Sequence, residues 1–305
     1  MNTKLHTGAM NNRFPLSLIV LAVFLMAGCS RPGDAGRRVV LENKGSDTLV
    51  NVAQAWAEAY QTVNPELAIA VTGGGSGTGI AALINGTVGI ANSSRSIKDS
   101  EIEQARANGQ EPIEFIVGYD ALAVYVHNNN PMTEISLEQL AGVYGENGTI
   151  VSWDQLGLNV PGCREQEIIR VSRQNNSGTY EYFREAVLGD QDFKLGSRDM
   201  HGSKDVVDLV QSTPCAVGYS GLAYATEEVH MPCVVGPEGC VFPSVETAID
   251  RSYPIARPLF MYTNGAPTGA VKEYLDWILS DEGQCILLEK GYAPATKVTC
   301  DAPSA

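Results

Sequence analysis

The sequence lacks most of what a metal site or a catalytic centre requires. It has 4 histidines at scattered positions and no Cys-x-x-Cys or His-Glu-x-x-His pattern, which argues against a zinc site. It has no Gly-x-Ser-x-Gly elbow for a serine nucleophile, and Ile80 stands where a P-loop would need lysine after the glycine-rich stretch 73–79. We therefore expect no metal, no cofactor and no enzymatic activity.

Positive charge is also scarce. The chain has 21 Lys and Arg residues against 35 Asp and Glu residues, which gives a formal net charge of −14. Such an acidic chain is a poor partner for nucleic acid, because binding to the phosphate backbone needs clustered basic side chains. An anionic ligand would have to be held by local hydrogen-bond donors and dipoles, since the overall field repels it.

Long apolar runs are absent after the first thirty residues. The run 14–27 follows Lys4 and Arg13, is too short to span a bilayer well and ends in small residues, so we interpret 1–28 as a secretion signal. The sequence Leu-Met-Ala-Gly-Cys at 25–29 resembles a bacterial lipobox, in which Cys29 is acylated and becomes the new N-terminus. The alternative is an ordinary signal peptide that is cleaved beside a chance cysteine.

Removal of this segment has two consequences. The chain loses Lys4 and Arg13 and no acidic residue, so its formal charge changes from −14 to −16. Residues 29–37 would then form a tether between the lipid and the folded part. We expect an exported protein of the periplasm or cell envelope that is held at a membrane through Cys29 alone.

Six cysteines remain after Cys29, and an even number in an exported chain indicates disulfides. Two pairs are close enough in sequence to be local bridges, which leaves one pair of distant cysteines, and a zinc site is the weaker alternative. The expected pairs are Cys233 with Cys240, Cys285 with Cys300, and Cys163 with Cys215.

One pattern recurs three times along the chain: an apolar strand, a polar loop rich in Gly, Ser, Thr or Asn, and a helix with a buried face. The strands are expected at 39–41, 67–71 and 168–171, and the loops at 45–48, 73–78 and 172–177. Repeated strand–loop–helix units predict an α/β architecture with largely parallel strands.

Two further strand-like segments, 115–127 and 255–262, lie far apart in the sequence. A chain that leaves one lobe and later returns to it needs two such crossings. Because the mature chain also exceeds the usual size of a single domain, we predict two lobes. Lobe 1 is placed at 38–118 plus 256–300 and lobe 2 at 119–255.

The three polar loops each lie directly before a helix, where unpaired backbone N–H groups and the helix dipole favour oxyanions. Ser and Thr also cap helices throughout proteins, so a single loop of this kind would indicate only capping. Arg173 changes the balance, because it lies four residues before Ser177-Gly178-Thr179 and adds a fixed positive charge to a helix N-terminus. We expect these groups to meet around one tetrahedral anion.

At these loops the chain resembles the phosphate-binding subunit of bacterial phosphate ABC transporters. The resemblance is carried, in order along nearly all of the mature chain, by Gly45-Ser46-Asp47-Thr48-Leu49, by Thr72 to Gly79, by Ala91-Asn92-Ser93-Ser94-Arg95, by Arg173 to Thr179, and by Tyr253-Pro254-Ile255-Ala256-Arg257-Pro258-Leu259. It implies a two-lobed periplasmic-binding-protein fold of type II, with dehydrated phosphate in the cleft between the lobes. It also implies phosphate and the permease subunits as partners, and we expect a monomer.

Carried over by position, the resemblance implies a phosphate site. Ser46 is added because its motif is short and its side chain can reach the same anion. The implied contacts are Ser46, Thr48, Leu49 through its backbone N–H, Ser76, Ser94, Arg173, Ser177, Gly178 and Thr179. Arg95, beside Ser94, is either another ligand contact or part of an ion pair in the cleft.

One departure bears on selectivity. Well-known members of the family have an aspartate where this chain has Ser94, and that carboxylate accepts the proton of hydrogen phosphate and rejects sulfate. Asp47 or Asp120 could take over this role. The alternatives left open are therefore sulfate, molybdate or tungstate as ligand, and a phosphate sensor or surface module in place of a transport protein. An exported hydrolase of phosphate esters lacks the nucleophile, base and metal ligands that it would need.

Overall fold

The structure is a computed structural model that describes residues 39–237 and 239–300. The predicted signal peptide 1–28, the predicted lipidation site Cys29 and the predicted tether 29–37 lie outside these residues. Within the described residues, the helices are all too short or too polar to cross a membrane.

The described residues form alternating strands and helices. The strands are β1 (Val39–Gly45), β2 (Leu67–Thr72), β3 (Ile90–Ser93), β4 (Pro112–His127), β5 (Glu134–Ser136), β6 (Ile169–Arg173), β7 (Arg198–Met200), β8 (Ala216–Gly221), β9 (Val229–His230), β10 (Cys233–Gly236), β11 (Gly239–Val241), β12 (Ala256–Asn264) and β13 (Ala293–Pro294). The α-helices are α1 (Val50–Val63), α2 (Ser76–Ile84), α3 (Asp99–Ala107), α4 (Leu137–Tyr144), α5 (Gly178–Ala186), α6 (Ser203–Gln211), α7 (Val245–Ile249), α8 (Gly269–Ile278) and α9 (Asp281–Glu289), and the 3₁₀ turns are η1 (Trp153–Leu156) and η2 (Leu222–Tyr224).

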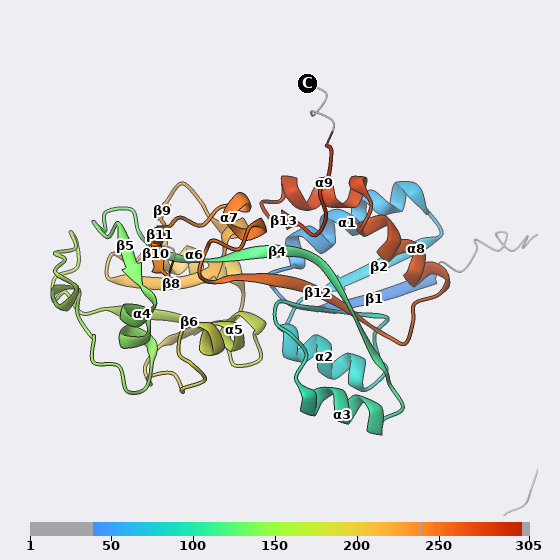
Figure 1. Cartoon of the computed structure of the whole chain (residues 1–305), viewed down its shortest axis with the longest axis horizontal. Coiled ribbons are helices and arrows are strands. Elements are labelled where there is room, and N and C mark those ends of the chain that lie inside the picture. The colour runs from blue at the N-terminus through green and yellow to red at the C-terminus, as the bar shows by residue number, and fades with distance from the viewer. Residues whose placement is uncertain (1–38, 238, 301–305) are drawn as a thin grey trace, which may run out of the picture. The chain divides into compact units, whose positions relative to one another are not determined.

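The main sheet consists of two parallel groups joined by antiparallel strands. Its path in the described part of the chain is β2-β1-β3-β12-β4-β8-β6-β7 (Figure 1). β1 runs parallel to β2 and β3, and β6 runs parallel to β7 and β8. β12 and β4 lie antiparallel to each other between these groups. The predicted α/β fold, with parallel strands in each lobe and two crossing segments, is confirmed.

The long strand β4 changes partner part-way along its length. Residues 112–121 pair with β12, and residues 122–126 pair with β8 in the other group. β4 and β12 therefore run side by side from one group of strands to the other, as Figure 1 shows. The two predicted crossing segments lie on these strands. The lobe boundaries inferred from the sequence remain a prediction, which this change of partner supports.

The first lobe is held by a core between α1, α8, α9 and the sheet. The apolar residues of α1 recur at helical spacing, so Trp56 and Tyr60 point into this core, where the ring of Tyr60 lies 5.0 Å from that of Tyr274. The indole N–H of Trp56 donates to the carbonyl of Gly283 at 2.7 Å. This contact ties the middle of α1 to α9.

The second lobe has an aromatic core. The ring of Phe183 from α5 stacks on that of Tyr219 from β8 at 3.9 Å, and Tyr144 packs edge-on against both rings. The hydroxyl of Tyr219 is paired with Ser172 of β6 at 2.7 Å. The core therefore holds α5 against the end of β6, where the third polar loop begins.

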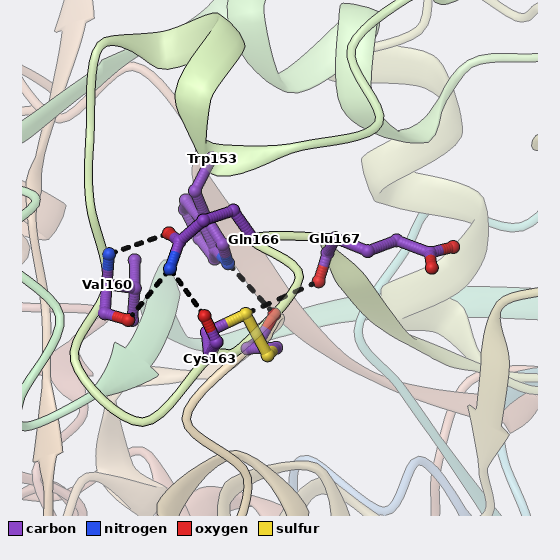
Figure 2. Close-up of a disulfide and its surroundings, with 6 residues drawn as sticks. Trp153, Val160, Cys163, Gln166 and Glu167 are labelled. Carbon is purple, nitrogen blue, oxygen red and sulfur yellow. Dashed lines mark hydrogen bonds between the residues drawn. A yellow bond between two sulfur atoms is a disulfide. The ribbon is translucent and has the colours of Figure 1, made fainter.

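The six cysteines after Cys29 form the three predicted disulfides, Cys163–Cys215, Cys233–Cys240 and Cys285–Cys300. Figure 2 shows the bridge between Cys163 and Cys215, beside which the indole of Trp153 donates to the Cys215 carbonyl at 3.1 Å. Gln166 donates from its side-chain amide to the carbonyls of Val160 and Cys163. The disulfide and the Trp153 bond thus tie this region to Cys215, directly before β8, while the Gln166 bonds close the loop after η1 on itself.

The three bridges should contribute unequally to stability. Cys163 and Cys215 are 52 residues apart, whereas Cys233 and Cys240 are 7 apart. Because a longer closed loop removes more entropy from the unfolded chain, we expect Cys163→Ala/Cys215→Ala to lower the free energy of unfolding by about 2 kcal/mol more than Cys233→Ala/Cys240→Ala. Urea denaturation of both double variants measures this difference. Equal losses, or a larger loss from the short loop, would contradict it.

Candidate functional site

Three helix N-termini meet at the junction between the two groups of strands. They belong to α1, α2 and α5, and each follows one of the polar loops predicted from the sequence. β1 and β2 precede the first two loops and β6 precedes the third, so the loops lie at carboxyl ends of parallel strands, where open α/β sheets bind ligands. The local positive potential of three helix N-termini suits an anion.

Five buried hydroxyl side chains lie between these helices, and we call them the hydroxyl cluster. They are Ser46, Thr48, Ser76, Ser94 and Thr179. Ser46 Oγ donates to Ser94 Oγ at 2.9 Å, and Ser76 Oγ lies 3.4 Å from Ser94 Oγ. Thr48 Oγ1 lies 3.1 Å from Thr179 Oγ1. Five of the predicted ligand residues, from four separate loops, are therefore brought together.

Gly178 closes one side of this cluster. A Cβ atom at this position would lie 2.2 Å from Ser76 Oγ and 2.7 Å from Ser94 Oγ, so the hydroxyls pack directly on the glycine backbone. Ser177 caps α5, since its Oγ accepts the N–H of Thr179 at 3.1 Å, and its own hydroxyl hydrogen remains a donor.

Leu49 fits its predicted role less simply. Its side chain is buried in the core of the first lobe, and its N–H donates to the carbonyl of Ser46 at 3.1 Å. This bond belongs to the tight turn before α1. The N–H of Leu49 is thus occupied in this structure, and it could bind an anion only by sharing or exchanging that bond.

Arg173 lies at the end of β6 and is almost completely buried. Its Nη2 donates to Asp47 Oδ2 at 3.1 Å and to the carbonyl of His201 at 2.9 Å, while Nη1 donates to Ser203 Oγ at 3.0 Å. Its Nε is buried and has no hydrogen-bond partner among the described residues. Burial lowers the pKa of Arg173, and the charge of Asp47 opposes this effect. The side chain thus places a positive charge next to Asp47, in the loop that supplies Ser46 and Thr48.

A second guanidinium, that of Arg257, lies at the hydroxyl cluster, although the sequence pointed only to Arg173 and, as one of two alternatives, to Arg95. Its Nη2 lies 3.3 Å from Thr48 Oγ1 and 3.2 Å from Thr179 Oγ1, and also donates to Asp120 Oδ2 at 2.8 Å. The sequence contained a signal, because Arg257 belongs to the return segment that carries part of the resemblance. Its role depends on a partner 137 positions away, which local patterns do not reveal.

The two candidate proton acceptors are both engaged with arginines. Asp47 accepts from Arg173 through Oδ2 and from the N–H of Gly74 through Oδ1 at 2.8 Å. Asp120 accepts from Arg257 through Oδ2 and from the N–H of Leu222 through Oδ1 at 3.2 Å. Burial raises the pKa of Asp120, and the positive charge of Arg257 acts against this. The side-chain acceptors of the cluster itself are hydroxyl oxygens.

Arg95 forms an ion pair and lies apart from the cluster. Its two terminal nitrogens donate to both carboxylate oxygens of Glu101, at 2.8 and 2.7 Å, and Nη1 also donates to the carbonyl of Ser96. Of the two roles considered for Arg95, the structure supports the ion pair.

The glycine-rich loop before α2 touches the loop before α5. The N–H of Gly77 donates to the carbonyl of Asn176 at 2.9 Å, and the side-chain amide of Asn176 donates to the carbonyl of Gly74 at 2.9 Å. A Cβ atom on Gly75, whose φ is +91°, would lie 2.6 Å from the Asn176 carbonyl oxygen. Glycine is therefore needed here for close backbone approach between the lobes as well as for conformation.

Comparison with known proteins agrees with this geometry. A family model described as the PBP superfamily domain matches residues 32–282. The phosphate-binding protein PstS of Pseudomonas aeruginosa PAO1 is 32% identical over 267 residues, covering 83% of this chain and 82% of that protein. The protein of the same name from Bacillus subtilis strain 168 is 29% identical over 302 residues, covering 93% of this chain and 96% of that protein.

Solved structures are similar as well. A Clostridium perfringens substrate-binding protein assigned to phosphate ABC transport, with bound phosphate, superposes with a TM-score of 0.74 at 30% identity, covering 84% of this chain and all of that one. An ABC-type phosphate transport receptor from Vibrio cholerae gives a TM-score of 0.67 at 26% identity, with coverages of 83% and 99%.

The packing of Gly178 predicts a sharp effect of one methyl group. Gly178→Ala should push Ser76 and Ser94 apart and weaken binding of a tetrahedral oxyanion by about 5- to 150-fold, the usual cost of overpacking a close contact. Calorimetric titration with the anion measures the change. Glu185→Ala, on the exposed face of the same helix, is the matched control and should bind like the parent. Unchanged affinity in Gly178→Ala would show that the closed cluster is not the binding site.

Proposed function

Since this chain belongs to the PstS family of phosphate-binding proteins within the PBP superfamily, we propose that it binds inorganic phosphate outside the cytoplasm and delivers it to the permease of an ABC transporter. The observation that carries this proposal is the buried hydroxyl cluster between three helix N-termini. Its donors come from both groups of strands, so an anion bound there would hold the two lobes together. A site built from hydrogen-bond donors suits binding and release of an anion that is not chemically changed.

The proposed site keeps the residues predicted from the sequence. Phosphate oxygens accept hydrogen bonds from the hydroxyls, from the N-terminus of α5 and from the guanidinium of Arg173. The proposed contacts are Ser46, Thr48, the N–H of Leu49, Ser76, Ser94, Arg173, Ser177, Gly178 and Thr179.

Charge balance explains why many neutral donors are required. Arg173 is paired with Asp47 and Arg257 with Asp120, so the four charged side chains of these two pairs carry no net charge together. A dehydrated anion must then be stabilised by hydroxyl and backbone dipoles, which are fixed in position and need no counter-ion. The absence of a carboxylate at Ser94 keeps sulfate and molybdate as competing ligands, and the titration below decides among them.

The proposal places the protein in the periplasm or cell envelope as a monomer. Its membrane association rests on acylated Cys29 alone, with residues 29–37 as the tether. The proposed lobes are 38–118 plus 256–300 and 119–255, and their two crossing strands would flex as the cleft opens.

Loss of Arg173 should weaken binding strongly. Arg173→Ala removes a buried positive charge and leaves Asp47 without its guanidinium partner beside the anion. We expect a loss of about 2–5 kcal/mol, which is about 30- to 5,000-fold in affinity. Thr179→Ala removes a neutral hydrogen bond and should cost about 1–3 kcal/mol. Calorimetric titration of the parent and both variants with phosphate, sulfate and molybdate measures these differences.

The same titration can reject the proposal. Either Arg173→Ala binding phosphate as tightly as the parent, or a parent that prefers sulfate or molybdate, would contradict it. Thermal unfolding of the anion-free proteins serves as the folding control.

The anchor is tested separately from the ligand. We expect Cys29→Ser to be released from the membrane fraction and to lose the mass of the acyl chains, because a single lipid-bearing residue holds the protein there. Membrane fractionation and intact-mass measurement check this. A Cys29→Ser protein that stays in the membrane fraction at an unchanged mass, apart from the substitution itself, would disprove the lipobox interpretation.

A further inference from the structure

Arg257 and Asp120 form an ion pair in the interior whose position needs an explanation. Both side chains are 0% exposed, and the two residues face each other across the crossing strands β12 and β4. Burying two charges costs desolvation that their attraction barely repays, so such a pair is a weak source of stability. Apolar residues of similar size would stabilise the fold equally well, so the reason for the pair lies in the other contacts of the guanidinium.

One edge of the guanidinium is fixed by its carboxylate. Nε and Nη2 donate to Asp120 Oδ2 at 3.1 and 2.8 Å, and the ring centroid of Tyr182 lies 5.6 Å from Cζ. The phenol of Tyr182 donates to the carbonyl of Ala256 at 2.6 Å, which holds that ring in place. The guanidinium therefore has little freedom to turn.

The other edge points to the hydroxyl cluster. Nη2 lies within hydrogen-bond distance of Thr48 Oγ1 and Thr179 Oγ1, and Nη1 donates to the carbonyl of Ser94 at 3.3 Å. These three residues belong to three different loops, and each is a proposed phosphate contact. One side chain thus links the donors of both lobes.

The guanidinium has donor capacity left for a ligand. It carries five N–H groups; Nε uses one and Nη2 uses one for Asp120, and Nη1 makes a single long bond with its two hydrogens. Because the threonine hydroxyls accept from Nη2, their own hydrogens are directed away from it, and the pair Thr48–Thr179 uses one of the two. One Nη1 hydrogen and one threonine hydroxyl hydrogen therefore have no partner in the described part of the chain.

We propose that Arg257, held by Asp120, is a second anion-binding residue of this site, beside Arg173. This inference rests on the proposed function, since it concerns the same hydroxyl cluster. The ligand would then contact the crossing strands directly, because Arg257 lies on β12 and its partner Asp120 lies on β4.

The test uses the mature protein freed of anion and titrated with phosphate, sulfate and molybdate. Whichever of the three the parent binds most tightly is then the probe for the variants. We expect Arg257→Ala to bind this anion about 10- to 100-fold more weakly than the parent, as for loss of hydrogen bonds from a charged donor. Arg257→Lys should recover part of the loss because it restores the charge. Arg95→Ala is the control, because Arg95 is also a buried arginine but pairs with Glu101 outside the cluster. Its affinity for the anion should stay within about 2-fold of the parent.

A double-mutant cycle separates binding from a purely structural role. If Arg257 orients the Thr48 hydroxyl toward the anion, Thr48→Val should weaken binding less in the Arg257→Ala background than in the parent. Thermal unfolding without anion should stay cooperative in each variant. If Arg257→Ala does not fold, Arg257→Gln replaces it, since the amide keeps a donor for Asp120 without the charge.

Three results would overturn the proposal: affinity within about 2-fold of the parent in the neutral variant, no recovery in Arg257→Lys, or additive effects in the cycle. A parent that binds sulfate or molybdate best rejects the proposed function, while the role of Arg257 is still decided with that anion. A parent that binds none of the three anions rejects both.

Discussion

The proposed site depends on stabilising a buried negative charge without a surplus of positive charge. Each guanidinium beside the hydroxyl cluster already has a carboxylate partner, Asp47 for Arg173 and Asp120 for Arg257. The chain as a whole is acidic, so long-range attraction does not compensate. What remains is a shell of fixed dipoles, made of helix N-termini and hydroxyls, and the fold holds these at one point between its two groups of strands.

This requirement explains why glycines and buried polar side chains stand at positions where they would otherwise lower the stability of the fold. Gly178 allows Ser76 and Ser94 to approach the backbone of α5, and Gly75 allows the same approach to Asn176. The aspartates hold the two guanidinium groups in place. Polar atoms whose burial alone would cost free energy are therefore buried together, and Nε of Arg173 has no hydrogen-bond partner within 39–237 and 239–300.

Much of the fold could be predicted because its signals are local. The strand, polar loop and helix that run from Val39 through α1 follow from apolar spacing, and two disulfides follow from the spacing of their cysteines. The third, Cys163–Cys215, was left by elimination once the two local pairs were assigned. The loops that supply the cluster could be predicted for the same reason. Arg257 could not, because its place is set by strand pairing with Asp120 across more than a hundred residues. The hydrogen bond from the N–H of Leu49 to the carbonyl of Ser46 could not be predicted from the sequence either, because it depends on the detailed backbone geometry before α1.

The most direct test of the central claim is a crystal structure grown with equal concentrations of arsenate and selenate, heavy analogues of phosphate and sulfate. Anomalous scattering at the two absorption edges identifies which element is bound and where. The account predicts an arsenic peak in the hydroxyl cluster between Arg173 and Arg257, with arsenate oxygens within hydrogen-bond distance of Thr48, Ser94 and Thr179. A selenium peak in that position, or no anomalous peak within the hydroxyl cluster, would contradict it.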